Sequence, residues 1–211
     1  MRPRSTQTPT PQRQRPKATA PSTAIGHATH EIRIIGGLWK RSKLKVLDKP
    51  GLRPTPDRVR ETLFNWLGQD LTGWQCADAF AGTGVLGFEA ASRGAQQVWM
   101  WEQDAALVTQ LTDSKTRLKA AMVQVQRGDA VLGLQRTAPG SMDLVFLDPP
   151  FDSDIFASAL QAAGQAVAPG AWVYLEAPVQ WSDEQLAPWF LTVQRHLKAG
   201  AVHAHLLQKM A

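Results

Sequence analysis

Four consecutive residues in the second half of the chain have the chemistry needed to hold an amine: Asp148, Pro149, Pro150 and Phe151. The Asp148 carboxylate and the Pro149 carbonyl can accept hydrogen bonds from an exocyclic amine, and Phe151 can stack on the base that carries it. These bonds would localise the nitrogen lone pair and prepare it to attack an electrophile. The alternative is structural: a Pro-Pro turn ends a strand, and Phe151 is a hydrophobic plug.

The residues before this motif predict the element that positions it. Residues 142–147 are mostly apolar, with the length and the β-branched and aromatic content of a buried strand. The strand must stop at the two prolines, because proline has no N–H group to donate to a sheet. The motif is therefore expected at the carboxyl end of a central strand, where open α/β sheets bind ligands.

A second group of residues could bind a nucleotide-like cofactor. Gly82, Gly84 and Gly87 follow a predicted strand, and Glu102 ends the next strand 20 residues after Gly82. This spacing also matches the fingerprint of NAD-binding sites. Asp78 separates the two readings, because its carboxylate would repel a pyrophosphate but attract an ammonium and a sulfonium. The sequence therefore favours S-adenosylmethionine over NAD.

Asp129 and Ala130 follow a third predicted strand, residues 122–126. The Asp129 carboxylate could accept a hydrogen bond from the adenine amine of the cofactor. It could equally be the N-cap of a helix over residues 130–136. Spacing alone leaves both readings open.

Charge and composition restrict the protein class. The net charge is +5; residues 31–65 hold nine Lys or Arg and four Asp or Glu, whereas residues 66–211 hold nine and fourteen. A basic region on an acidic body is typical of a protein that grips a polyanion from one side. The single cysteine, Cys76, fits a reducing compartment, and we expect a cytoplasmic protein with no membrane span and no secretory signal.

Residues 1–30 contain five prolines and show no hydrophobic periodicity, so we expect a disordered basic tail. Residues 33–46 predict a hairpin with a Gly36-Gly37 turn or bulge, in which Trp39 lies among basic residues. That combination suits a nucleic-acid backbone with a splayed base. The alternative is a charged edge that prevents strand aggregation.

A helix is expected over residues 57–67, capped by Thr55 or Asp57, with an apolar stripe facing the core. Three nearby arginines could hold phosphates or pair internally, and spacing does not decide between these roles. They are Arg53, Arg58 and Arg60.

The rest of the chain predicts an α/β protein with a sheet of about seven mostly parallel strands and helices on both faces. After Phe151 we expect a helix over residues 155–167 ended by Pro169-Gly170, and then a strand over residues 171–175 with Glu176 at its end. Residues 191–197 and 201–209 predict an antiparallel hairpin at one edge. His203 and His205 share a face of the last strand but lack a third ligand at metal-binding spacing, so no metal site is expected.

These motifs are similar to those of known enzymes. Residues 78–84 resemble the methyl-donor motif of class I S-adenosylmethionine-dependent methyltransferases, and residues 148–151 resemble the amino-methylating motif of that superfamily. Residues 33–37, 52–55 and 57–65 resemble the RsmD family of bacterial 16S ribosomal RNA methyltransferases, which modify N2 of guanine 966. Thr83, where relatives often have Ser, and the long tail depart from the family pattern.

The resemblance covers about residues 31–211 and implies a Rossmann-like fold and methyl transfer to N2 of guanine 966 in 16S ribosomal RNA. Composition and motifs along the chain predict a tail (residues 1–30), an RNA-binding extension (31–67) and a methyltransferase domain (68–211). We expect the RNA to lie within the small subunit or its assembly intermediate and the protein to be a monomer. The expected cofactor contacts are Asp78, Ala81, Gly82, Thr83, Gly84, Glu102, Asp129 and Ala130. The expected RNA contacts are Arg33, Trp39, Lys40, Arg41, Lys43, Arg53, Arg58 and Arg60.

Three other functions remain open at this point. The same chemistry could act on another amine, such as adenine N6 of DNA or a protein glutamine amide. A non-catalytic RNA-binding assembly factor would share the basic region but would have no need of Asp78, Glu102 and Asp148. An NAD-dependent oxidoreductase is disfavoured by Asp78 and by the Pro-Pro motif.

Overall fold

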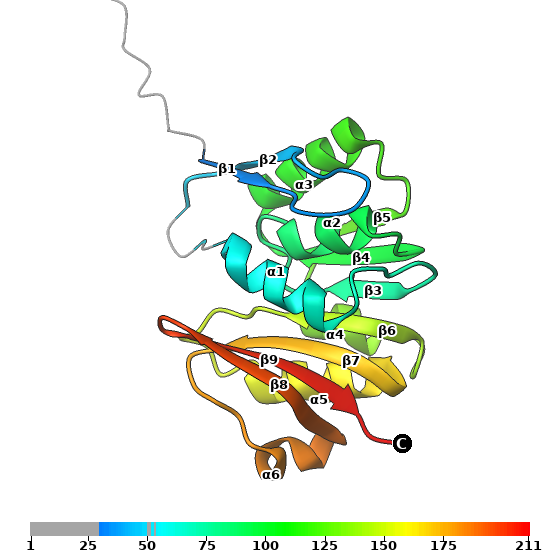
Figure 1. Cartoon of the computed structure of the whole chain (residues 1–211), viewed down its shortest axis with the longest axis vertical. Helices are drawn as coiled ribbons and strands as arrows, with labels where there is room; N and C mark the ends of the chain where they lie inside the picture. The colour runs from blue at the N-terminus through cyan, green and yellow to red at the C-terminus, as the bar shows by residue number, and fades with distance from the viewer. Residues whose placement is uncertain (1–29, 50–51, 53) are drawn as a thin grey trace, which may run out of the picture.

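The computed structural model describes residues 30–49, 52 and 54–211 (Figure 1). The tail expected over residues 1–30 lies, apart from His30, outside the described residues, as does Arg53.

A seven-stranded sheet in the order β5-β4-β3-β6-β7-β9-β8 forms the centre of the molecule. The pairs from β5 to β7 are all parallel, and β9 is antiparallel to both β7 and β8. The predicted fold class and the edge hairpin are confirmed. The strands are β3 (Gln75–Asp78), β4 (Gln97–Glu102), β5 (Val123–Arg127), β6 (Met142–Leu147), β7 (Val167–Ala177), β8 (Leu191–Ala199) and β9 (Val202–Lys209).

Helices cover both faces of the sheet and form one hydrophobic core on each side (Figure 1). The first face carries β1 (His30–Arg33), β2 (Lys43–Val46), α1 (Asp57–Trp66), α2 (Val85–Ser92) and α3 (Ala105–Leu118). The second face carries α4 (Ala130–Gln135), α5 (Phe156–Ala166), α6 (Asp183–Leu186) and the 3-10 turn η1 (Ala187–Trp189). Since β1, β2 and α1 share a core with α2 and β3, packing does not separate residues 31–67 from the sheet region.

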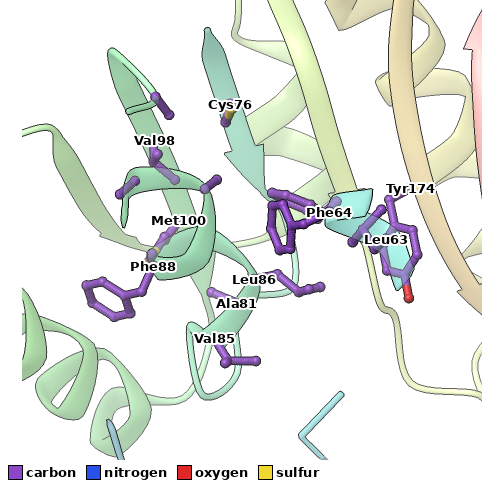
Figure 2. Packing of buried hydrophobic residues seen from close by; sticks show 14 of the residues in the cluster. Leu63, Phe64, Cys76, Ala81, Val85, Leu86, Phe88, Val98, Met100 and Tyr174 are labelled. Carbon is purple, nitrogen blue, oxygen red and sulfur yellow. The ribbon is translucent and has the colours of Figure 1, made fainter. Parts of the chain in front are cut away.

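Helix α1 packs on the first face through its apolar stripe, as predicted. Leu63 and Phe64 are fully buried, and each such side chain stabilises the fold by about 1.5–3 kcal/mol. The Phe64 ring lies 6.3 Å from that of Phe146 on β6, which lies 6.2 Å from Tyr174 on β7. Figure 2 shows Leu63 and Phe64 of α1 near Tyr174. This row of aromatic rings fixes α1 over two neighbouring strands.

The predicted cap of α1 is wrong. Pro56 occupies the N-cap position, and no side chain caps the helix. Asp57 is the first helical residue and binds the Arg60 guanidinium at 2.5 Å, while the Thr55 carbonyl accepts from Arg60 Nε at 3.1 Å. Arg60, and not the helix end, therefore uses these acceptors.

Pro169 and Gly170 do not separate α5 from the next strand, contrary to the expectation from the sequence. Strand β7 begins at Val167, directly after α5, and its pairing with β6 shifts between the Met142 and Leu144 positions. A bulge accommodates a proline without an N–H group and a glycine at φ +80°. The strand is therefore longer than the predicted residues 171–175.

Candidate active site

The turn after β3 is built from residues that leave its backbone open to a ligand. Gly82 and Gly84 have φ values of +50° and +77°, which side chains rarely adopt. A side chain at Gly84 would also collide with Leu111 and Phe88. Gly84 is the N-cap of α2, so the turn delivers the chain directly into that helix. Ala81 and Thr83, also predicted to contact the cofactor, are buried beside these glycines.

Glu102 joins this turn to the neighbouring strand. Its Oε2 accepts from the Gly82 N–H at 2.9 Å, and its Oε1 accepts from the Asp104 N–H at 2.8 Å. Each carboxylate oxygen keeps a lone pair after these bonds. The side chain is half-buried at the end of β4, so it remains available to a ribose hydroxyl pair.

Asp78 is only 2% exposed at the end of β3. Its Oδ2 accepts from the Gly87 N–H at 2.9 Å, but no cation within the described residues forms an ion pair with it. Burial, followed by the nearby Glu102, raises the pKa of Asp78 to about 7, against the Gly87 hydrogen bond. A cationic ligand at this position would restore the charged form.

Asp129 is the N-cap of α4, so the capping interpretation is confirmed. Its Oδ1 accepts from the Leu132 N–H at 2.9 Å, and its Oδ2 accepts from Gln103 Nε2 at 3.1 Å. Gly128 donates to the Glu102 carbonyl at 3.0 Å, which brings the end of β5 against the end of β4. The adenine contact proposed for Asp129 and Ala130 stays a prediction.

Asp148 follows the last residue of β6, and β6 is the neighbour of β3. Phe146 pairs with Asp78 across these strands, so the amine-holding motif lies beside the glycine turn. Burial, then Glu176 and Asp78, raise the pKa of Asp148 well above its usual range. The Pro149 ring is buried, while Pro150 and Phe151 are exposed, Phe151 by 38%.

Glu176 was predicted only as the end of a strand, yet it belongs to this site. It is 4% exposed, and its Oε1 accepts from the Tyr174 hydroxyl at 2.8 Å. Burial raises its pKa, while hydrogen bonds from Tyr174 and Thr55 act to lower it. The signal was present in the sequence as an acid ending the strand next to Asp148, but the pairing of the strands was needed to see it.

Most of the predicted RNA contacts lie at the surface of the N-terminal region. The exposed ones are Arg33, Lys40, Arg41, Lys43 and Arg58. Trp39 is half-buried, packs against the first core, and donates its backbone N–H to Ser92 Oγ at 2.9 Å. Lys43 pairs with Glu31 at 2.6 Å on the surface. RNA binding by the exposed residues stays a prediction.

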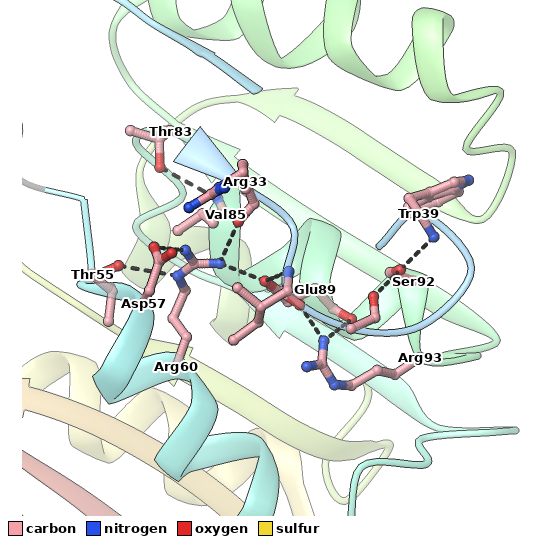
Figure 3. Close-up of polar contacts among 12 residues, drawn as sticks. Arg33, Trp39, Thr55, Asp57, Arg60, Thr83, Val85, Glu89, Ser92 and Arg93 are labelled. Atoms are coloured by element: carbon pink, nitrogen blue, oxygen red, sulfur yellow. Dashed lines mark hydrogen bonds and ion pairs between the residues drawn. The ribbon is translucent and has the colours of Figure 1, made fainter. Parts of the chain in front are cut away.

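Arg60 cannot bind RNA in this fold, so that prediction is wrong. Its side chain is fully buried and forms ion pairs with Glu89 and Asp57 (Figure 3). Glu89, in the middle of α2, also accepts from the Ile35 N–H at 2.7 Å and pairs with Arg93. An arginine inside a core requires such partners, because leaving its charge unpaired would be costly.

Known proteins resemble this chain in sequence and in fold. A family model described as "Conserved hypothetical protein 95" matches residues 32–208. This chain belongs to that family. It is also 40% identical over 184 residues to "Ribosomal RNA small subunit methyltransferase D" of Escherichia coli K12, covering 86% of this chain and 91% of the relative. The resemblance to the RsmD family is thereby confirmed.

Two further members extend the comparison. The protein of the same name from Haemophilus influenzae is 41% identical over 187 residues, which is 86% of this chain and 96% of the relative. The solved structure of yhhF from Escherichia coli, described as a candidate methyltransferase, superposes with a TM-score of 0.75 at 38% identity, covering 86% of this chain and 99% of that one. The family fold is therefore the one described above.

Two features are absent from the part of the chain that the structure describes. Within it, no helix is both long and apolar enough to cross a bilayer. No group of three or more His, Cys, Asp or Glu side chains among the same residues is arranged to hold a metal ion.

Proposed function

We propose that this protein transfers a methyl group from S-adenosylmethionine to the exocyclic N2 amine of guanine 966 in 16S ribosomal RNA. One observation carries the proposal. Asp78, a buried carboxylate with no ion pair among the described residues, lies beside the motif that begins at Asp148 and would hold the amine. The two lie on adjacent parallel strands. The names of the relatives support ribosomal RNA as the substrate. They do not favour DNA adenine or a purely structural assembly role.

The site has the features that the cofactor needs. The side-chain-free turn at Gly82–Gly84 would receive it, Glu102 would hold its ribose hydroxyls, and Asp78 would face its positive groups. Asp129 and Ala130 would border its adenine. When bound, S-adenosylmethionine supplies an electrophilic methyl carbon on a sulfonium.

The chain's own residues would then position the amine. The target guanine must leave its stack, which costs a few kcal/mol, and stacking on Phe151 can offset roughly 1–3 kcal/mol of this. Asp148 and the Pro149 carbonyl accept the N–H hydrogens and hold the nitrogen lone pair toward the methyl group. Most of the acceleration would come from proximity and electrostatic placement.

We infer that the substrate is the small ribosomal subunit or its assembly intermediate, and that the enzyme works as a monomer in the cytoplasm. The exposed basic residues of the N-terminal region would hold the phosphates on one side. Naked RNA and the assembled subunit differ in the surface that surrounds the target guanine.

The test is incubation with radiolabelled S-adenosylmethionine and three unmodified substrates: naked 16S RNA, small subunits and duplex DNA. Digestion to nucleosides should give label in N2-methylguanosine, and the better RNA substrate identifies the recognised form. Label only in DNA would overturn the substrate while keeping the chemistry. Absence of label from all three, with the cofactor bound, would refute the proposed substrate.

A further inference from the structure

The pairing of β6 with β7 places two acids side by side, the half-buried Asp148 and the buried Glu176. Phe146 lies opposite Tyr174 and Leu147 opposite Leu175, so Asp148 and Glu176 are the next pair. Side chains alternate along strands, so both acids point to the face on which the Phe146 and Tyr174 rings meet. That is the face covered by α1, beside the glycine turn.

Glu176 is fixed more firmly than Asp148. The Tyr174 hydroxyl donates to it at 2.8 Å, and Thr55 holds it from the segment that precedes α1. Asp148 has no protein donor among the described residues. No ion pair links either acid to a cation in that part of the chain. One carboxyl group is therefore held rigidly, and its neighbour is free to engage a ligand.

Two neighbouring carboxylates that are shielded from water cannot both ionise easily. The ionisable groups that face Asp148 are Asp78 from β3 and Glu176 and Tyr174 from β7. None of them is a cation, and the buried arginine of α1, Arg60, is engaged by Glu89 and Asp57. The result is an Asp148 carboxylate that binds a proton much more readily than a surface aspartate.

Methyl transfer to an amine creates a need for such a group. The carbon–nitrogen bond forms as the methyl–sulfur bond of the donor breaks, with that bond's electron pair remaining on sulfur. The nitrogen is then positively charged, and an N–H bond must break with its electron pair staying on nitrogen. We propose that Glu176 is a positioning residue that makes Asp148 the acceptor of this proton. Asp148 enters the step as a carboxylate, leaves it as a carboxylic acid, and releases the proton to water with the product. This inference rests on the proposed amine methylation.

The test compares Glu176→Gln, which removes the charge, with Glu176→Asp, which keeps it. The Asp148 carboxyl carbon is titrated by NMR in the cofactor-free protein. Glu176→Gln should lower its midpoint by about one pH unit. The acid limb of kcat should move to lower pH in the same direction, with kcat at the plateau reduced about threefold or more. Glu176→Asp should retain most of the wild-type behaviour.

A merely structural Glu176 gives a different result. Its loss would reduce kcat without moving the Asp148 midpoint or the acid limb, and that result would overturn the inference. Tyr174→Phe is the milder second variant if Glu176→Gln folds poorly. Without the phenol, Glu176 takes the shared proton more readily, so Asp148 should again titrate at lower pH. The NMR titration is valid even if the wild type methylates none of the RNAs, so failure of the substrate proposal is recognised separately.

Discussion

Asp78, Asp148 and Glu176 occupy positions that are unfavourable for the stability of the fold. Each has a raised pKa because burial disfavours its charged form. Groups held in this way are typical of functional sites, because the ligand supplies the charge or the donors that the protein withholds.

Asp148→Asn should reduce turnover far more than cofactor affinity. The amide keeps the shape but offers the amine a weaker acceptor and cannot take a proton, so kcat should fall by about 10²-fold or more. Single-turnover methylation measures the first quantity, and calorimetric titration with S-adenosylmethionine measures the second. Equal losses in both would mean that Asp148 serves the cofactor and not the amine.

Asp78→Asn should stabilise the cofactor-free protein at alkaline pH. The folded-state pKa of about 7 lies above the ordinary 3.8, so the folded state binds the proton more tightly. Its contribution to stability is present below pH 4 and is lost as the pH rises through 7. The neutral amide avoids this loss, which amounts to up to about 4 kcal/mol.

Thermal unfolding from pH 4 to pH 8 tests this prediction. The variant and the wild type should have similar melting temperatures at pH 4, and the variant should melt higher at pH 8. It should also bind S-adenosylmethionine more weakly. A variant that is less stable than the wild type at pH 8 would show that the charged carboxylate already has a partner.

The sequence was sufficient to place Asp78 and Asp148 at strand ends, because it marks both strands clearly: Asp78 ends β3 and Asp148 follows β6. Burial and strand pairing decided the other cases. The spacing of Arg60 on its helix does not distinguish it from an exposed arginine. Its buried partner Glu89 lies 29 residues further along the chain, beyond the reach of local patterns. Glu176 acquires a neighbour only when β6 and β7 are paired.

At the scale of elements, Glu89 connects helix α2 to the segment after β1 and to helix α1. It accepts from the Ile35 backbone after β1, from Arg60 on α1 and from Arg93 at the end of α2. Arg93 in turn lies 4.0 Å above the Phe64 ring. The segment after β1 and helix α1 thus share one buried carboxylate as a polar attachment to α2, in addition to their apolar packing on the sheet.

Glu89→Gln should destabilise the protein by about 3–5 kcal/mol, because two arginines would lose their buried counter-charge. Urea denaturation gives the free energy of unfolding. The matched control is Glu31→Gln, which removes the exposed partner of Lys43 and should cost about 1 kcal/mol or less. Similar costs for the two variants would contradict the view that Glu89 is the main attachment.

Local sequence signals gave wrong predictions at two element ends, and the reason was the same at both. Thr55 and Asp57 carry capping chemistry, and Pro169-Gly170 carries the chemistry of a turn. In both places tertiary partners override the local preference: Arg60 binds the first pair, and the register shift between β6 and β7 absorbs the second. The number of strands, the edge hairpin and the helix positions, which depend on longer hydrophobic patterns, were predictable.

At the scale of the whole molecule, the exposed basic residues of the N-terminal region lie on the first face of the sheet. Replacing Lys40 and Arg41 together by Ala should weaken RNA binding for all sequences alike. Each lost phosphate contact should reduce the slope of log K against log salt by about 0.7 for single-stranded RNA. Binding titrations at several salt concentrations measure this slope.

Arg136 provides the control for this double variant. It is exposed at the end of α4, on the opposite face of the sheet. Arg136→Ala should leave the salt slope unchanged. If it reduces the slope as much as the double variant does, RNA is not held on the N-terminal face.

Helix α2 sets a fixed distance between the glycine turn and the hairpin loop. The glycine turn enters the helix at one end, and the backbone of the hairpin loop binds Ser92 at the other, with Leu38 N–H donating to the Ser92 carbonyl at 2.6 Å. Eight residues at about 1.5 Å each make the helix about 12 Å long. If the hairpin loop holds RNA phosphates as proposed, the enzyme selects its target by distance. The flipped base must lie a set distance from the phosphates that the loop binds.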